Sequence, residues 1–334
     1  MAGTGSFVFT EPQMYQSAIW PAQVEVVATT KGDFHAELKR IELSQLWIQS
    51  ARVNLPVIYH TAVSAGRAPI FFVAKGNQAA YHYGGLDTSL GEIIAVRAGS
   101  THYSRSEGNS HWGTLSLTHE DLAVAGRLLA GCELTAPSIM RRLRPSHRLV
   151  SRLLNLHEAV EKIADTPTHI LTQPEAVRAL EQALMHAMIM CMTDGSPVEM
   201  RSGARQHLAI LARFEDFVTA NENRPLYLTE ICAAVGVSGR MLRMCCQEHL
   251  GMGPVRYLWL RRMHLARRAL LQATPEKATV AAIAMDYGFW ELGRFAVRYR
   301  ELFGERPSAS LLRPPRDRWK PKTRPLALPL SETA

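Results

Sequence analysis

The arginines of the C-terminal third are the side chains most suited to binding chemistry, and the ligand that they suit is a polyanion. Residues 206–334 contain 20 Lys and Arg against 12 Asp and Glu, so this third carries the whole formal charge of +8. A basic field confined to one part of a chain attracts nucleic acid. A solubilising surface, which is the alternative, would spread its charge over the whole chain. The distribution therefore favours nucleic acid as the partner.

The same third contains an internal repeat. At offsets of 52 or 53 positions, Ile231, Gly236, Val237, Leu242, Gly251 and Pro254 recur as Ile283, Gly288, Phe289, Phe295, Gly304 and Pro307. Each copy has a short helical stretch, a tight turn at its first glycine, a longer helical stretch and a Gly-x-x-Pro stop. Glycine suits a turn that needs a positive φ, and helix-turn-helix units commonly have one there. The repeat therefore predicts two helix-turn-helix units.

The apolar positions of each copy predict which face of its second helix points outward. In the first copy Ile231, Cys232 and Val235 are expected to meet Leu242, Cys245 and Cys246, and in the second Ile283, Ala284 and Tyr287 are expected to meet Phe295 and Tyr299. A second helix exposed in this way can enter a major groove, where Arg reads guanine edges. The predicted DNA contacts are Ser238, Arg240, Met241, Arg243, Met244, Gln247, Glu291, Leu292, Gly293, Arg294, Val297, Arg298 and Arg300.

The segment between the two copies sets their separation. Residues 254–273 contain no internal Gly or Pro after Pro254, which predicts one continuous helix. Twenty residues at ~1.5 Å each span roughly 30 Å, close to the ~34 Å turn of B-DNA. One chain is therefore expected to place both recognition helices in successive major grooves. The arginines of this segment are interpreted as structural pairs or phosphate contacts, and they are Arg261, Arg262, Arg267 and Arg268.

Residues 207–312 resemble the DNA-binding domain of the AraC/XylS family of bacterial transcription regulators. The resemblance is carried by IAMDYGFWELGRFAVRYRELFGERP in the second copy and by YLWLRRMHLARRALL between the copies. It implies two recognition helices per chain, activation of nearby genes as the usual role, and an N-terminal domain for a small effector or for dimerisation. The first copy departs from the family pattern, with Met244 and Cys246 where Arg and Phe are usual. Arg240 and Arg243 are then expected to contact bases there.

The rest of the chain predicts an α+β fold with a β-rich part followed by helices. Residues 30–120 have short apolar runs between glycine turns, as in a sandwich or small barrel, and residues 121–193 have helical periodicity. The apolar stripes of two expected helices are Leu149, Leu153, Leu156, Val160 and Ile163, and Val177, Leu180, Leu184, Met188 and Cys191. Packing within the chain and dimerisation both explain these stripes.

The expected boundaries follow from composition. Residues 1–200 form an effector-sensing or dimerisation domain, and residues 194–203, which are small, polar and broken by Pro and Gly, form a linker. Residues 205–313 form the double helix-turn-helix domain, and the basic, proline-rich residues 314–334 form an unstructured tail.

The family resemblance implies a cupin-like barrel for the sensing domain, but the sequence indicates no metal site. His35, His60, His82, His102 and His111 are scattered and lack the spacing of a ligand set, so no metal and no cofactor are expected. An organic effector would need an apolar pocket with a few polar groups. The residues predicted to line it are Trp47, Tyr59, Phe72, His82 and Arg97.

Several features narrow the class of protein. The apolar run at residues 183–192 is half the ~20 residues of a membrane span, no export signal is evident, and the five cysteines have no C-x-x-C spacing. We therefore predict a cytoplasmic, non-enzymatic regulator that binds promoter double-stranded DNA, with RNA polymerase as partner if it activates, a small-molecule effector and a homodimer. In one alternative the N-terminal part only dimerises or binds a protein. A metal-dependent or cysteine-based repair enzyme is a weaker alternative.

Overall fold

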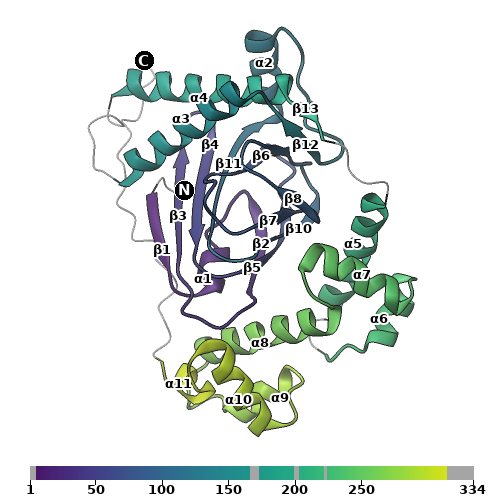
Figure 1. Ribbon diagram of the computed structural model, residues 1–334. Coiled ribbons are helices and arrows are strands. Elements are labelled where there is room, and N and C mark those ends of the chain that lie inside the picture. Colours follow the sequence, from purple (N-terminus) through teal and green to yellow (C-terminus); the bar gives the residue numbers. More distant parts are fainter. Residues whose placement is uncertain (1–4, 166–172, 199–202, 222–223, 314–334) are drawn as a thin grey trace.

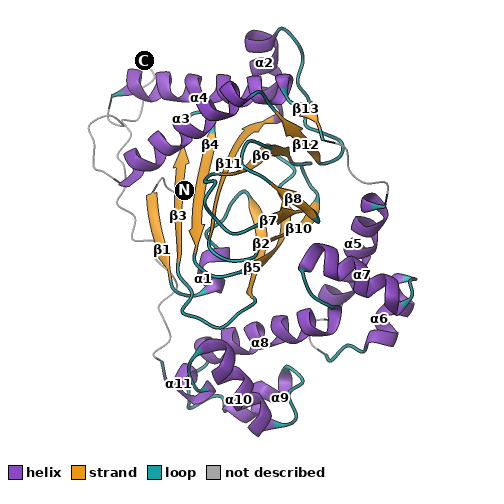
Figure 2. Ribbon diagram, viewed as in Figure 1, coloured by secondary structure: helices purple, strands orange, loops and turns teal. Residues whose placement is uncertain are grey.

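The computed structural model describes residues 5–165, 173–198, 203–221 and 224–313. Residues 5–198 contain all the described strands and are called the sheet region, and residues 203–313 are helical and are called the helical region. Figure 1 shows the helical region wrapped around one side and the lower end of the sheet region, and Figure 2 separates the two by secondary structure. The expected tail, residues 314–334, lies outside the described residues.

Two antiparallel sheets face each other in the sheet region. The larger has the strand order β1-β3-β4-β11-β6-β9-β12-β13 and the smaller β2-β5-β10-β7-β8. Their bounds are β1 Gly5–Phe9, β2 Ala22–Ala28, β3 Ala36–Glu42, β4 Trp47–Val53, β5 Val57–Val63, β6 Arg67–Val73, β7 Tyr81–Tyr83, β8 Leu86–Thr88, β9 Ile93–Ala95, β10 Thr101–Ser106, β11 Ser110–Thr118, β12 Arg141–Arg144 and β13 Ser196–Pro197. Side chains from both inner faces, such as Leu38, Tyr59 and Trp112, form one buried cluster. The sheets are not closed into the single barrel that we expected.

The sheet region begins earlier than the sequence predicted. The expected β-rich stretch started at residue 30, whereas β1, the short helix α1 (Pro12–Gln16) and β2 precede it. β1 has the alternating burial of a strand with one face on the core, and Phe7 and Phe9 are buried. The strands were predicted from the glycine turns that separate them, and no glycine lies between β1 and β2. The spacing of Phe7 and Phe9, two residues apart, was the sequence feature from which β1 could have been predicted.

Three helices cover the outer face of the larger sheet. They are α2 (His119–Ala130), α3 (His147–Asp165) and α4 (Pro174–Asp194). Their apolar stripes, including Leu153, Val160, Leu184 and Met188, share a buried cluster with Ile48 and other sheet residues. Of the two explanations for the stripes, packing within the chain is the one that the structure supports.

Part of the expected linker joins the sheet. Ser196 and Pro197 form β13, which pairs with Arg144 and Leu143 of β12, and the backbone N–H of Val198 donates to the carbonyl of Arg142 at 2.9 Å. The small, polar composition of this segment fits an edge strand as well as a linker, and only the neighbouring strand decides between them.

The helical region contains seven described helices. They are α5 (Ala204–Ala220), α6 (Leu228–Val235), α7 (Gly239–Leu250), α8 (Pro254–Gln272), α9 (Val280–Asp286), α10 (Leu292–Phe303) and α11 (Pro307–Leu312). The predicted connector is confirmed as the unbroken helix α8, which spans the gap between the two helix-turn-helix units (Figure 1). No helix among the described residues is long and apolar enough to span a membrane.

Candidate nucleic-acid interface

Two residue types build the turn of the first unit, α6 and α7. Gly236 ends α6 with φ +72°, a left-handed conformation that costs glycine little. Ser238 begins α7, and its side-chain oxygen accepts a hydrogen bond from the backbone N–H of Met241 at 3.2 Å. This cap satisfies one of the free N–H groups at the start of the helix. The local sequence therefore fixes both the direction and the start of α7.

The predicted core of the first unit is confirmed. Ile231 and Val235 of α6 and Leu242, Cys245 and Cys246 of α7 are each at most 1% exposed. They belong to one cluster, in which the partly buried Cys232 also takes part. Because this face of α7 is buried, the opposite face points to solvent.

The second unit, α9 and α10, repeats the arrangement with different caps. Thr279 caps α9 by accepting from the N–H of Ala282 at 3.1 Å, and Gly288 makes the turn with φ +76°. Phe295 and Tyr299 of α10 are buried against α9, as predicted. Glu291 precedes α10 and makes no side-chain cap. The two recognition helices, α7 and α10, therefore start with unequal local support.

The residues predicted to contact DNA lie on the outward faces of α7 and α10 or at their starts. All are exposed except Met241 and Leu292, which are half-buried. Met244, which stands where the family usually has Arg, is 46% exposed, and Val297 is 58% exposed. Cys246, the other departure, lies in the core.

The arginines of these faces have weak partners or none. Arg294 pairs with Glu291 at 3.4 Å and Arg298 with Glu301 at 2.9 Å, and all four side chains are more than half exposed. Exposed pairs of this kind contribute only about 0–1 kcal/mol, so a phosphate or base can replace the carboxylate. Within the described part of the chain, Arg240 and Arg243 make no ion pair.

The arginines of α8 divide into structural and free side chains. Arg261 donates to both carboxylate oxygens of Glu25 at 2.8 and 2.9 Å, and Arg267 donates to both oxygens of Glu11 at 3.0 and 2.9 Å. Both guanidinium groups are buried, which confirms the structural pairs that we expected. Arg268 is exposed.

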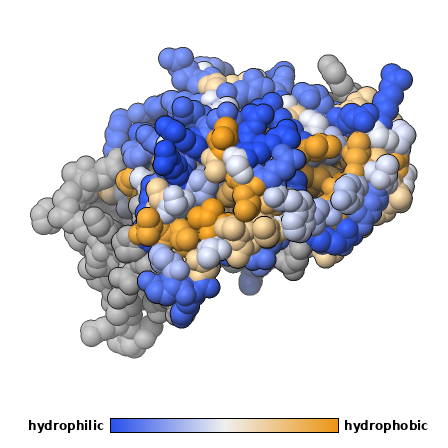
Figure 3. All heavy atoms as spheres, turned by 90° about the horizontal axis from the view of Figure 1, so that it is seen from below, coloured by the Kyte–Doolittle hydropathy of each residue, from blue (hydrophilic) through white to orange (hydrophobic). Residues whose placement is uncertain are grey.

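A groove separates the two recognition helices. Its volume is about 880 Å³, its floor includes Trp259 and Met263 of α8, and its walls include Arg243 of α7 and Arg294 of α10. Three exposed residues of this groove were not predicted from the sequence, and they are Val255, Arg256 and Trp290. Figure 3 shows the molecule from below, where hydrophobic residues form an interrupted band across a largely hydrophilic face.

Known proteins with similar sequences identify the type of helix-turn-helix domain. A model described as "Helix-turn-helix domain" matches residues 231–313, which include α7, α8 and α10. The C-terminal third is an AraC/XylS-type helix-turn-helix domain. The chain is 35% identical over 152 residues to "Probable thc operon regulatory protein" of Rhodococcus erythropolis, covering 43% of this chain and 46% of that protein. It is 34% identical over 99 residues to "XylDLEGF operon transcriptional activator 2" of Pseudomonas putida, covering 30% of this chain and 63% of that protein.

The chain thus spans less than two thirds of the length of these two relatives. Among solved structures, it is similar to the AraC-like transcriptional activator CuxR, with 18% identity, a TM-score of 0.40 and coverage of 84% of this chain and 100% of that chain. The predicted family resemblance is confirmed for the C-terminal third. The Rhodococcus erythropolis and Pseudomonas putida relatives are named as an operon regulatory protein and a transcriptional activator, in agreement with the prediction of a non-enzymatic protein.

The AraC/XylS-type domain is docked on the smaller sheet through buried polar contacts. Tyr103 of β10 donates a hydrogen bond to Glu215 of α5, and His264 of α8 bonds the carbonyl of Ala28 at 2.9 Å. The end of α7 also meets the sheet region, because a Cβ on Gly85 would lie 2.5 Å from the ring of His249. Burial lowers the pKa of His249 to about 4 and the pKa of His264 to about 4, so both rings are neutral at pH 7.

Glu25, His60 and Glu215 come together at this junction, from β2, β5 and α5. Their ligand atoms lie within 4.8 Å of one another, which is close enough for a metal ion. However, Arg261 already donates to Glu25 and lies 3.7 Å from Glu215, and His60 lies 3.4 Å from Glu215. A guanidinium in this position neutralises the carboxylates and repels a cation, so the group is better explained as an ion-pair cluster that joins the two regions.

The five predicted effector residues are dispersed. Tyr59 lines a cavity of about 80 Å³ between the sheets, and Arg97 lines a second cavity of about 350 Å³ between the smaller sheet and α5. Trp47, Phe72 and His82 line neither of these cavities. Trp47 packs on Trp20, Phe72 on His157, and His82 bonds Asp87 and Glu107, at 2.6 and 2.9 Å.

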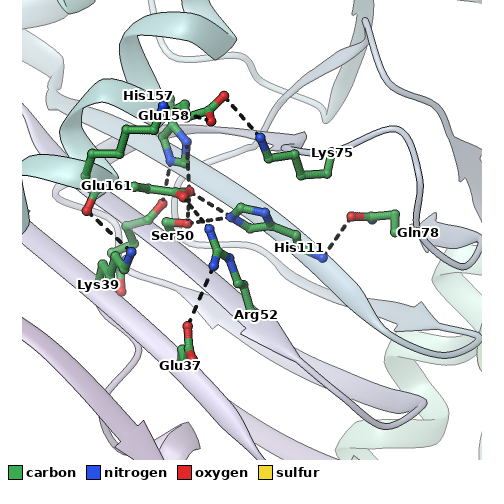
Figure 4. Close-up of polar contacts among 12 residues, drawn as sticks. Glu37, Lys39, Ser50, Arg52, Lys75, Gln78, His111, His157, Glu158 and Glu161 are labelled. Carbon is green, nitrogen blue, oxygen red and sulfur yellow. Dashed lines mark hydrogen bonds and ion pairs between the residues drawn. The ribbon is translucent and has the colours of Figure 1, made fainter. Parts of the chain in front are cut away.

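A polar network between the larger sheet and α3 has the residue types of a hydrolase, and Figure 4 shows it. His111 Nε2 lies 3.0 Å from Ser50 Oγ and 2.7 Å from Glu161. A catalytic triad needs the serine and the acid on opposite ring nitrogens, whereas here both meet the same one. All three residues are also at most 6% exposed. The network is therefore structural.

The charge of Glu161 fits that structural role. Burial raises its pKa, but the hydrogen bond from His111 and the charge of His157 outweigh burial and lower it to about 2. Arg52 also pairs with this carboxylate at 3.0 Å. An ionised Glu161 therefore ties α3 to the larger sheet.

The cysteines do not have the environment of a nucleophile. Burial raises the pKa of the Cys191 thiol to about 12 and that of Cys245 to about 11, so both stay protonated at neutral pH. Cys132 is exposed and follows the end of α2 in the sheet region. This distribution gives the repair-enzyme alternative no support.

Proposed function

We propose that this protein is a sequence-specific DNA-binding transcription regulator that places α7 and α10 in successive major grooves of promoter DNA. The observation that carries the proposal is the pair of recognition helices with exposed basic faces, joined by one continuous helix. α8 has 19 residues and is about 28 Å long, which suits the ~34 Å repeat of B-DNA.

Each recognition helix has its own means of reading bases. In α7, Arg240 and Arg243 reach guanine edges and take over from the Met244 position. In α10, Arg294 and Arg298 provide charge, and Leu292 and Val297 contact thymine methyl groups. The remaining predicted contacts complete the two interfaces. They are Ser238, Met241, Met244 and Gln247 in the first unit and Glu291, Gly293 and Arg300 in the second.

The sheet region is proposed as a cupin-like sensor for a small-molecule effector. The cavity at the junction supports this role, because its volume of about 350 Å³ fits a small ligand and its lining comes from both regions. Arg97 and His60 provide its polar groups, and Leu208 and Leu211 of α5 provide apolar ones. A ligand there would contact the sheet and the helical region together and could change how firmly they dock.

Further parts of the proposal concern organisation and partners. The sensor is assigned to residues 1–200 and the DNA-binding domain to residues 205–313, with a basic tail at 314–334. The protein would work as a homodimer in the cytoplasm, where the chromosome is, and as an activator it would contact RNA polymerase. In the alternative, the sheet region only dimerises or binds a protein partner.

The test is a DNA-binding measurement with matched variants. Duplexes selected from a random library by the full-length protein are measured by fluorescence anisotropy at several salt concentrations. We expect salt-dependent, sequence-dependent binding, and Arg240→Ala or Arg294→Ala should weaken it by roughly 1–3 kcal/mol and relax specificity at one position. A selection that enriches no sequence would contradict the proposal. Unchanged binding by both variants would remove these two residues from it.

A further inference from the structure

We propose that the groove between the recognition helices binds the sugar–phosphate backbone of the DNA segment that joins the two major-groove contacts. This inference rests on the proposed function and adds a third contact surface to it. The groove has about 880 Å³ and is bounded by both recognition helices and by the first half of α8.

The charge of the groove suits a polyanion. Five arginines line it against one carboxylate, that of Glu291, and they are Arg243, Arg256, Arg262, Arg294 and Arg298. Glu291 already faces Arg294 at 3.4 Å. Arg256 is exposed on the first turn of α8, and within the described residues it makes no ion pair. A phosphate is therefore offered a guanidinium that no protein group neutralises.

The apolar residues of the groove suit the sugar. Trp290 is 68% exposed and Val255 is 63% exposed, and both line the groove. Large apolar side chains left exposed beside arginines are typical of an interaction surface. A deoxyribose presents an apolar face next to its phosphate. The arginines and the exposed apolar side chains of the groove therefore match the sugar–phosphate backbone of one DNA strand.

The position of the groove selects the segment of DNA. Arg243 belongs to α7 and Arg298 to α10, and both line the groove. If each helix enters a major groove, the DNA that passes between them must cross this hollow. An acidic protein segment would match the charge too, but it would not be continuous with the contacts on both sides.

The first experiment compares three variants of the full chain on a duplex selected by the wild type. Arg256→Ala should weaken binding about fivefold at 0.15 M salt. The plot of log association constant against log salt concentration should become less steep by about 0.9, as expected for the loss of one phosphate contact. Trp290→Ala should weaken binding roughly three- to fivefold and leave the slope unchanged. Arg178→Ala is the matched control, because Arg178 is an exposed arginine on α4 of the sheet region, and it should bind as the wild type does.

The second experiment neutralises the DNA in place of the protein. Methylphosphonate is substituted one position at a time across the centre of the selected duplex. The wild type should lose about fivefold at one central position, and Arg256→Ala should lose nothing further there.

These results separate the inference from the proposed function. If the wild type binds its selected duplex but Arg256→Ala and Trp290→Ala match Arg178→Ala, the groove does not bind DNA and the inference is wrong. The same conclusion follows if central methylphosphonates have no effect on the wild type, and an acidic partner then becomes the better occupant. If no duplex is selected at all, the proposed function itself fails.

Discussion

The two helix-turn-helix units share a sequence pattern but are held in place differently. In the first unit the recognition helix itself meets the sheet region, with His249 of α7 against Gly85 and Gly251 beside Arg105. In the second unit α10 packs against α9 and α11, and the link to the sheet region runs through Arg267 of α8 and its partner Glu11. A change in the sheet region therefore reaches α7 directly, whereas it reaches α10 through α8 and through Arg313, which follows α11 and pairs with Glu11 at 3.2 Å.

Two buried arginines of α8 link the helical region to the sheet region, one near each unit. Arg261 faces Glu25 and Glu215 near the first unit, and Arg267 faces Glu11 and Glu305 near the second, at 2.9 Å in each of its pairs. Opposite charges raise the pKa of both guanidinium groups even though burial lowers it, so both remain charged. α8 thus joins the two helix-turn-helix units and also attaches them to the sheet region through two buried arginines.

The largest expected effect is the loss of one of these buried arginines. Arg261→Met should lower the free energy of unfolding by about 3–5 kcal/mol, because it leaves the buried carboxylate of Glu215 and the partly buried carboxylate of Glu25 without their partner. Denaturant unfolding of the full chain measures it. Arg268→Met, an exposed arginine on the same helix, is the control and should change stability by at most about 0.5 kcal/mol. Equal effects of the two variants would show that the attachment does not depend on the buried pair.

A smaller and unequal effect is expected at the two turn glycines. Gly236→Ala should cost about 1–2 kcal/mol, because it forces a left-handed φ on alanine but places Cβ in open space. Gly288→Ala should cost about 1–3 kcal/mol more, because its Cβ would also lie 2.9 Å from Pro225. Thermal and denaturant unfolding measure both. Equal losses would mean that Pro225 moves aside freely and that the two turns are equivalent.

The smallest expected effect concerns the starts of the recognition helices. Ser238→Ala should destabilise the protein by about 1 kcal/mol, because the hydroxyl caps α7 through the N–H of Met241. Glu291→Ala should change stability by at most about 0.5 kcal/mol, because Glu291 makes no side-chain cap. Circular dichroism during denaturant unfolding of both variants checks this. A larger loss at Glu291 would show that its exposed pair with Arg294 supports α10 more than the cap supports α7.

Local patterns predicted the helical region well. The offset of 52 or 53 residues located both units, and the turns at Gly236 and Gly288 have the positive φ that the repeat required. The predicted connector differs from α8 by one residue at its end. These features depend on residues close in sequence, through helical periodicity, glycine and proline, so a single sequence carries them.

Patterns were less informative where distant segments meet. β1 and β2 were missed, and β13 was taken for linker, because a short edge strand is defined by its neighbour more than by its own residues. Only two of the five suggested effector residues, Tyr59 and Arg97, line either of the two cavities, because lining depends on how two sheets and α5 meet.

Residues close together in the chain are enough to specify two helix-turn-helix units on a basic segment, the outward faces of their second helices and the length of the helix between them. The attachment of α8 to the sheet region through Arg261 and Arg267, and the basic groove with Trp290 between the units, follow only from the packing of distant segments. The reason is physical. Periodicity and turns are encoded over a few residues, whereas Glu25 and Arg261, 236 positions apart, become neighbours only when the whole chain has packed.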